Sequence, residues 1–239
     1  MREEHFMETD VQAEARSDTL RPVASVWHTV VVLAVVGALA FRGKLRAEQM
    51  RALVNPDRIS IYEHTILFEW LVLGLVLVGV WLSGSSLFTV LGDRWRSARQ
   101  FLRDVGIGVL FLMASIMVTS IVGSHGGAGD KGTRFLLPQG GVEMALWVAL
   151  SITAGICEEA VYRGYMQKQF MALTRSVPAG IVLSAAAFGA AHSYQGFARA
   201  SLIGVMGAMG GILAYWCRSV RPGMIAHALQ DVLGGLVRH

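Results

Sequence analysis

Six ionisable side chains in the second half of the chain are of types that could together hydrolyse an amide. They are Glu158, Glu159, Arg163, His192, His227 and Asp231. Hydrolysis of an amide needs a base that activates water, donors for the developing oxyanion and an acid for the leaving amine. Carboxylates and imidazoles can supply all three functions, so this set is the candidate catalytic group.

The spacing within the set suggests a role for each member. His227 and Asp231 are four residues apart, so they share one face of a helix. We expect Glu158, beside His192, to hold and deprotonate a water, and His227 to donate to the oxyanion. Asp231 would orient His227 or, when protonated, donate a hydrogen bond itself.

Glu159 and Arg163 have the same one-turn spacing, which predicts an ion pair that fixes the end of a helix. Arg163 is therefore expected to be structural. Other readings stay open for the carboxylates and for the lone histidine. Glu158 and Glu159 would also suit a helix emerging into water, and His192 would suit a hydrogen-bonded packing residue.

The elements that position these residues are expected to be membrane helices. The chain has 239 residues, of which 54% are hydrophobic and 16% charged, against about 25% charged in a typical soluble domain. Apolar blocks approach the roughly 20 residues that span a bilayer. Seven are visible, with six or eight helices as alternatives: Val23–Phe41, Ile61–Leu82, Val105–Val122, Val142–Cys157 (continuing as a polar helix), Val177–Ala191, Phe197–Trp216 and Met224–Val237. The predicted fold is an all-α polytopic integral membrane protein with a catalytic core of the last four helices.

The apolar blocks and the candidate residues predict three parts of the chain: a polar tail at 1–22, N-terminal transmembrane helices at 23–141 and a catalytic membrane core at 142–239. Residues 42–60 form a basic connection that we expect to lie as an amphipathic helix on the membrane surface. The stretch Gly123–Arg134 is expected to be a flexible connector.

Intramembrane ionisable residues are functional candidates by default, which applies to His227 and Asp231. Glu69 also lies inside a predicted segment and receives no role. His28, Glu63 and His64 are read as interfacial. The glycines Gly204, Gly207 and Gly211 recur at helical spacing and predict close helix packing.

The loops on the side of the N-terminus, including Ser83–Asp104, Glu158–Ser176 and Arg218–Gly223, carry slightly more Lys and Arg than the opposite loops. This bias favours a cytoplasmic N-terminus. We expect a multi-pass protein of the bacterial cytoplasmic (inner) membrane. Basic residues scatter among the loops rather than lining one face, so nucleic-acid binding is not expected.

Three short motifs resemble one known family. "EEAVYR" (Glu158–Arg163), "FGAAH" (Phe188–His192) and "HALQD" (His227–Asp231) are similar to the motifs of the CAAX-protease and bacteriocin-processing (CPBP, also called Abi) family of intramembrane glutamic-type or metalloproteases. Each motif alone is weak, but all three occur in order on successive apolar segments. The resemblance covers Val142 to Val237 and implies catalytic roles for Glu158, Glu159, His192, His227 and Asp231.

The resemblance implies an intramembrane endopeptidase whose substrate is a membrane-associated protein or peptide, with C-terminal processing among the candidates. Asp231 departs from the eukaryotic-type pattern, which has Asn at this place. The resemblance thus implies peptide-bond chemistry without deciding whether the substrate is prenylated.

Two other function classes stay open: a proton-coupled transporter, and a non-catalytic bacteriocin-immunity or scaffold protein of the same fold. Rhomboid, zinc site-2 and presenilin-like signatures are absent from the sequence. No cofactor is certain. If a divalent metal such as zinc is used, Glu158, His192 and His227 are the candidate ligands.

Overall fold

Helices account for all the regular structure in the described part of the chain. The computed structural model describes residues 20–126 and 134–236. The first 19 residues of the predicted tail and residues 127–133 of the glycine-rich stretch lie outside this description. The elements are α2 (Val26–Arg51), α3 (Arg58–Leu82), α4 (Phe88–Leu91), α5 (Ala98–Gly126), η2 (Arg134–Leu136), α6 (Gly141–Glu158), η3 (Glu159–Met166), α7 (Gln167–Thr174), α8 (Val177–Ala191), η4 (Ser193–Gln195), α9 (Phe197–Cys217) and α10 (Arg221–Leu236).

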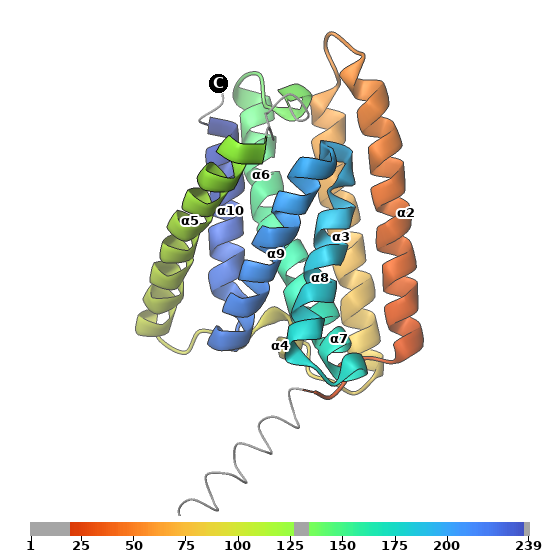
Figure 1. Cartoon of the computed structure of the whole chain (residues 1–239), viewed down its shortest axis with the longest axis vertical. Helices are drawn as coiled ribbons and strands as arrows, with labels where there is room; N and C mark the ends of the chain where they lie inside the picture. Colours follow the sequence, from red (N-terminus) through yellow and green to blue (C-terminus); the bar gives the residue numbers. More distant parts are fainter. Residues whose placement is uncertain (1–19, 127–133, 237–239) are drawn as a thin grey trace, which may run out of the picture.

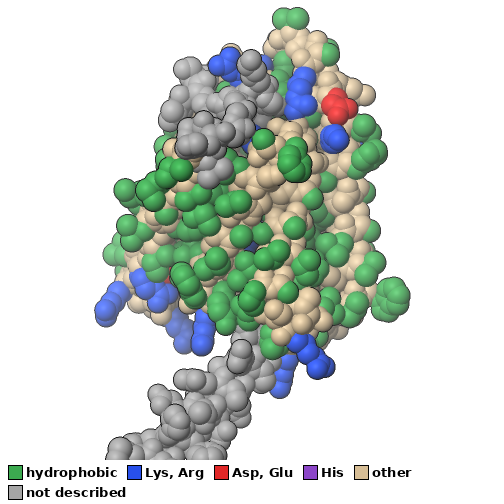
Figure 2. Space-filling view, viewed as in Figure 1, with side chains coloured by type: hydrophobic (Ala, Val, Ile, Leu, Met, Phe, Trp, Pro, Cys, Tyr) green, Lys and Arg blue, Asp and Glu red, His purple; other side chains and the backbone are tan. Residues whose placement is uncertain are grey.

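The helices form one bundle with an apolar exterior, as expected for a multi-pass membrane protein. Five helical segments are long and apolar enough to cross a membrane: Val26–Arg51, Arg58–Leu82, Ala98–Ile121, Gly141–Thr174 and Phe197–Cys217. The shorter α8 and α10 run alongside them (Figure 1). Figure 2 shows hydrophobic side chains covering the middle of the visible face and basic side chains at its ends. Each predicted apolar segment corresponds to one helix, which confirms the all-α polytopic fold.

The basic connection predicted at residues 42–60 is not a separate surface helix. α2 continues without a break through Arg51, and only the short stretch from Ala52 to Asp57 separates it from α3. Arg42, Lys44 and Arg46 therefore lie on a bundle helix. Their charged ends can reach the interface because long basic side chains extend away from the apolar stem.

The polar stretch after Cys157 is not an exposed loop or a helix end. α6, η3 and α7 form one continuous helical segment from Gly141 to Thr174. Its middle, Glu159–Met166, is a π-helix in which every residue is buried. Such wide turns are rare and occur frequently at functional sites. The charges of Glu159 and Arg163 therefore lie inside the bundle.

This central segment carries the core of the fold. α6 packs against α3 and α10, and α7 packs against α8. Tyr165 and Met166 are fully buried, together with Val76 and Val80 of α3 and Val90 of α4. The helices preceding α6 thus help to enclose the segment that bears the two glutamates.

A buried polar network joins the start of α2 to the same segment. The side-chain carbonyl of Gln169 accepts hydrogen bonds from the backbone N–H of Val23 (2.7 Å) and Ala24 (3.2 Å). Nε2 of His28 donates to the carbonyl of Leu75 at 3.1 Å, and Nδ1 is hydrogen-bonded to the Tyr165 hydroxyl at 2.6 Å. Since buried polar groups need partners, these bonds hold α2, α3 and the central segment in one register.

Candidate active site

The structure brings the six candidate side chains together from four parts of the chain. Glu158 ends α6, and Glu159 and Arg163 follow on η3. His192 caps α8, and His227 and Asp231 lie on α10. The three motifs, which are far apart in the sequence, therefore converge in the fold.

Glu159 and Arg163 form the buried base of this group. Their side chains are 5% and 4% exposed, and Nη1 of Arg163 lies 3.0 Å from Oε1 of Glu159. The same carboxylate oxygen lies 3.2 Å from Nδ1 of His227. Because an ionised carboxylate can only accept, Nδ1 carries the proton and donates to Glu159. The ion pair predicted from the one-turn spacing is confirmed, but it orients His227 rather than fixing a helix end.

Phe188 connects the arginine to both histidines. The guanidinium carbon of Arg163 lies 4.2 Å from the centre of the Phe188 ring. The ring makes edge contacts with His192 at 4.7 Å and with His227 at 6.1 Å between centroids. The phenylalanine of the second motif therefore packs against the arginine and both histidines. The motif includes this residue, but the sequence did not indicate these contacts.

His192 has a fixed tautomer that turns its other nitrogen towards Glu158. Nδ1 lies 2.9 Å from the carbonyl oxygen of Phe188. A carbonyl only accepts, so Nδ1 carries a hydrogen and Nε2 is left to face Glu158. Nε2 lies 4.0 Å from Oε1 of Glu158. This separation is too long for a direct hydrogen bond and suits a single water bonded to both atoms.

Glu158 lies between the two histidines. Its Oε2 is 3.6 Å from Nε2 of His227, which is also 3.6 Å from Oδ2 of Asp231. The side chains of Glu158, His192 and His227 are 16–18% exposed and that of Asp231 is 39% exposed. These four groups are reachable from outside the bundle, whereas Glu159 and Arg163 are not.

Two glycines permit the helix spacing that this site needs. A Cβ on Gly155 would lie 2.7 Å from the carbonyl oxygen of Met224, and one on Gly223 would lie 2.8 Å from Oε2 of Glu159. α6 and α10 can therefore approach backbone to backbone beside the carboxylates. The predicted packing role of small residues is also seen at Gly207, where a Cβ would lie 3.1 Å from Phe188.

Two further residues near the site were not given roles from the sequence. Glu69 on α3 lies within electrostatic range of Glu158, His227 and Asp231. Its Oε2 is buried and makes no hydrogen bond within the described residues. The only sign of Glu69 in the sequence was that it is an ionisable residue inside a predicted membrane segment.

Tyr194 follows α8 at the same end of the site. Its ring lies 6.0 Å from that of His192, and its hydroxyl accepts a hydrogen bond from Gln195 at 3.0 Å. Burial raises the pKa of Tyr194 to about 12, and the nearby carboxylates, Glu158 first among them, act in the same direction. The hydroxyl therefore stays protonated at neutral pH and can donate a hydrogen bond.

Glu158, His192 and His227 are the residues that would hold zinc, which would polarise a carbonyl or activate water. Within the described ranges, no three His, Cys, Asp or Glu side chains are placed to hold a metal. The arrangement within these ranges therefore does not fit a preformed metal centre.

The C-terminal segment matches one family model. Residues 140–233 match the model described as Type II CAAX prenyl endopeptidase Rce1-like. No curated protein and no solved structure matches the chain. The matched family is a protease family, which supports a peptide hydrolase in general terms. Over residues 140–233 the chain is thus similar to the Rce1-like CAAX endopeptidases, and this match confirms the family resemblance predicted from the three motifs.

Proposed function

We propose that the protein is an intramembrane endopeptidase that hydrolyses a peptide bond with water activated by Glu158 and His192. The observation that carries this proposal is the position of Glu158. Its carboxylate lies between Nε2 of His192 at 4.0 Å and Nε2 of His227 at 3.6 Å, at the exposed side of a buried ion pair.

In the proposed reaction, a water bonded to Glu158 and His192 attacks the substrate carbonyl while Glu158 accepts one of its protons. The developing oxyanion accepts a hydrogen bond from Nε2–H of His227 in its doubly protonated form. The C–N bond then breaks, and the proton held by Glu158 passes to the leaving amine. The products are a carboxylic acid, which then loses its proton to solvent, and a free amine.

The remaining residues act on these groups rather than on the substrate. Glu159, held by Arg163, accepts from Nδ1 of His227 and is proposed to be a positioning residue. Asp231 lies on the other side of the imidazole, and its greater exposure allows it to meet the substrate as well.

We also propose that residues 142–239 form the catalytic membrane core and that helices 23–141 enclose it. The substrate class is a membrane-associated protein or peptide, because the reacting groups lie within the helical bundle of a multi-pass protein. The cytoplasmic (inner) membrane of a bacterium is the proposed location.

Cleavage of peptides by the purified protein in detergent tests this function. A mixed library of apolar peptides with polar C-terminal ends is incubated with the protein, and the products are identified by mass spectrometry. Glu158→Gln should lower turnover by about 10²–10⁴, because Gln can bind water but cannot accept its proton. Glu63→Gln, an exposed change on α3, is the matched control. Near-normal turnover by folded Glu158→Gln would overturn the assignment of the base.

A further inference from the structure

A group of arginines lines a pocket at one end of the bundle, where α5 and α10 begin and α9 ends (Figure 1). The pocket has a volume of about 300 Å³. Its lining includes Arg94, Arg96, Arg103, Arg218 and Arg221 together with Trp95. Figure 2 shows basic side chains gathered at this end, next to the apolar surface. We call this feature the arginine pocket.

One wall of the arginine pocket is organised around the buried carboxylate of Asp104. Asp104 has a side chain only 3% exposed, and its carboxylate accepts from Nε1 of Trp95 at 2.9 Å and from Nη2 of Arg103 at 3.0 Å. The guanidinium carbon of Arg221 lies 4.7 Å from the centre of the Trp95 ring. Asp104 thus fixes the indole, and the indole fixes Arg221 by a cation–π contact. Such a wall orders a side chain that would otherwise move freely in solvent.

The charges of the pocket are not balanced by the protein. Asp104 is already paired with Arg103, and Asp93 lies close enough to Lys168 to act on it electrostatically. In the described part of the chain, the other four arginines of the pocket have no carboxylate within ion-pair distance. Nε of Arg221 is buried and has no hydrogen-bond acceptor there. A buried donor without a partner, among excess positive charge, points to an anionic ligand.

We propose that the arginine pocket binds the phosphate group of an anionic phospholipid. Guanidinium groups bind phosphate oxygens with paired hydrogen bonds. The pocket opens at an end of a bundle whose middle is apolar, which is where a headgroup would lie. Free inorganic phosphate shares the same chemistry and is the other source to be distinguished.

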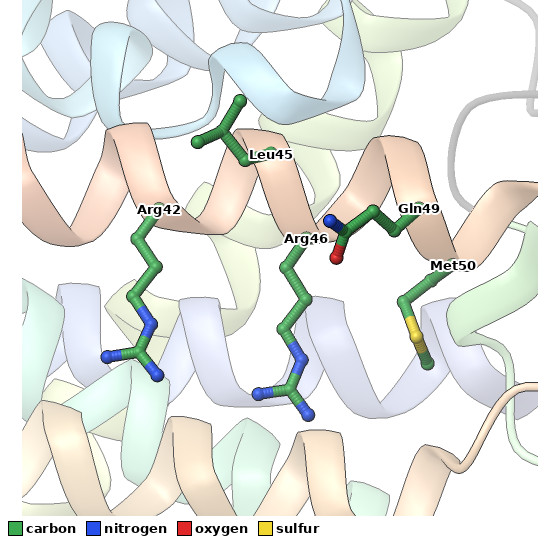
Figure 3. Close-up of a pocket in the computed structure, with 5 residues that line it drawn as sticks. All are labelled: Arg42, Leu45, Arg46, Gln49 and Met50. Atoms are coloured by element: carbon green, nitrogen blue, oxygen red, sulfur yellow. The ribbon is translucent and has the colours of Figure 1, made fainter.

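A second pair of arginines provides a matched comparison. Arg42 and Arg46 extend in parallel from one face of α2 and line a more open hollow with Leu45, Gln49 and Met50 (Figure 3). Arg42 lies 6.0 Å from the Phe68 ring, and no buried carboxylate or indole lines this hollow. Changing this pair removes the same charge without touching the arginine pocket.

The test measures the thermal midpoint of the full chain in detergent against the concentration of three probes. These are short-chain phosphatidylglycerol, short-chain phosphatidylcholine and inorganic phosphate. Binding to the folded state raises the midpoint in proportion to occupancy. The double variant Arg218→Gln/Arg221→Gln is compared with Arg42→Gln/Arg46→Gln. Trp95→Phe removes the bond to Asp104 while leaving every charge in place.

Phosphatidylglycerol should raise the thermal midpoints of the wild type and of Arg42→Gln/Arg46→Gln over the same range of lipid concentration. The pocket double variant should bind it about 30-fold more weakly, since each arginine near an anionic surface contributes about fivefold. Trp95→Phe should also weaken binding. Stabilisation by inorganic phosphate that is lost in the same variants supports the phosphate site and assigns it a soluble source.

Three results would overturn the proposal. The first is an equal loss of phosphatidylglycerol binding in the two double variants. The second is stabilisation by phosphatidylcholine equal to that by phosphatidylglycerol. The third is unchanged phosphatidylglycerol binding by the pocket double variant. The pocket double variant could bind weakly because it folds poorly. Trp95→Phe controls for this, because it keeps every arginine and an aromatic ring at position 95 and removes only the hydrogen bond to Asp104. All readouts are of binding, so they are independent of peptide hydrolysis.

Discussion

Glu159 and His227 are joined across the bundle: Oε1 of the glutamate lies 3.2 Å from Nδ1 of the histidine. The first residue is on the π-helix and the second on α10. Because Arg163 holds the same oxygen at 3.0 Å, the orientation of the imidazole depends on a buried ion pair.

Arg163→Ala should destabilise the fold by about 3–5 kcal/mol, because it leaves the buried charge of Glu159 without its partner. The thermal midpoint in detergent measures this loss. Arg99→Ala, an exposed change on α5, is a control for removing an arginine elsewhere. A variant with a wild-type midpoint and no turnover would show instead that Arg163 takes part in the chemistry.

His192→Ala and Glu158→Gln should each be severe, and their double variant should be hardly worse than either alone. Two groups that hold one water act as a unit, so their losses do not add. Turnover of the two single variants and the double variant gives the coupling directly. Additive losses would mean that the two residues act in separate steps.

Asp231→Asn should retain more activity than Asp231→Ala. The amide can still hydrogen-bond at the place where Oδ2 lies 3.6 Å from Nε2 of His227, whereas alanine leaves that place empty. We expect a loss of about tenfold or less for Asn and at least tenfold more for Ala, within the range of a positioned polar group. Equal turnover of the two variants would remove Asp231 from the site.

Glu69→Met should leave the thermal midpoint unchanged or raise it. Its carboxylate has a buried oxygen without a hydrogen bond in the described residues, and such a group is costly in an apolar bundle. Glu69→Gln separates the loss of charge from the change in packing. A marked fall in the midpoint for both variants would show that Glu69 has a stabilising partner.

Treatment with a zinc chelator should leave the rate of peptide cleavage unchanged. Zinc is then added back to the chelated protein as the control. This expectation follows from the reaction proposed for Glu158 and His192, which needs only water. Activity that is abolished by the chelator and restored by zinc would make Glu158, His192 and His227 ligands and replace the proposed mechanism.

The sequence determined the type of the main helices and the approximate place of each, because a segment in a bilayer must satisfy its backbone internally and be apolar outside. It also indicated which residues are candidates for the chemistry, since Glu158, His192 and His227 stand out against apolar surroundings. The one-turn pairing of Glu159 with Arg163 followed from helix geometry alone.

The tertiary structure decided which of these residues face one another. Local spacing contains no information on contacts between separate helices, so the bond between Glu159 and His227 could not be predicted from either motif. The same is true of the position of Phe188 between Arg163 and the histidines. The π-helix was also hidden, because a helix that widens by one residue per turn leaves no distinct composition. The polar residues after Cys157 suggest an emerging helix, but tertiary packing buries them. Burial gives the ion pair of Glu159 and Arg163 its proposed function of holding a histidine in place.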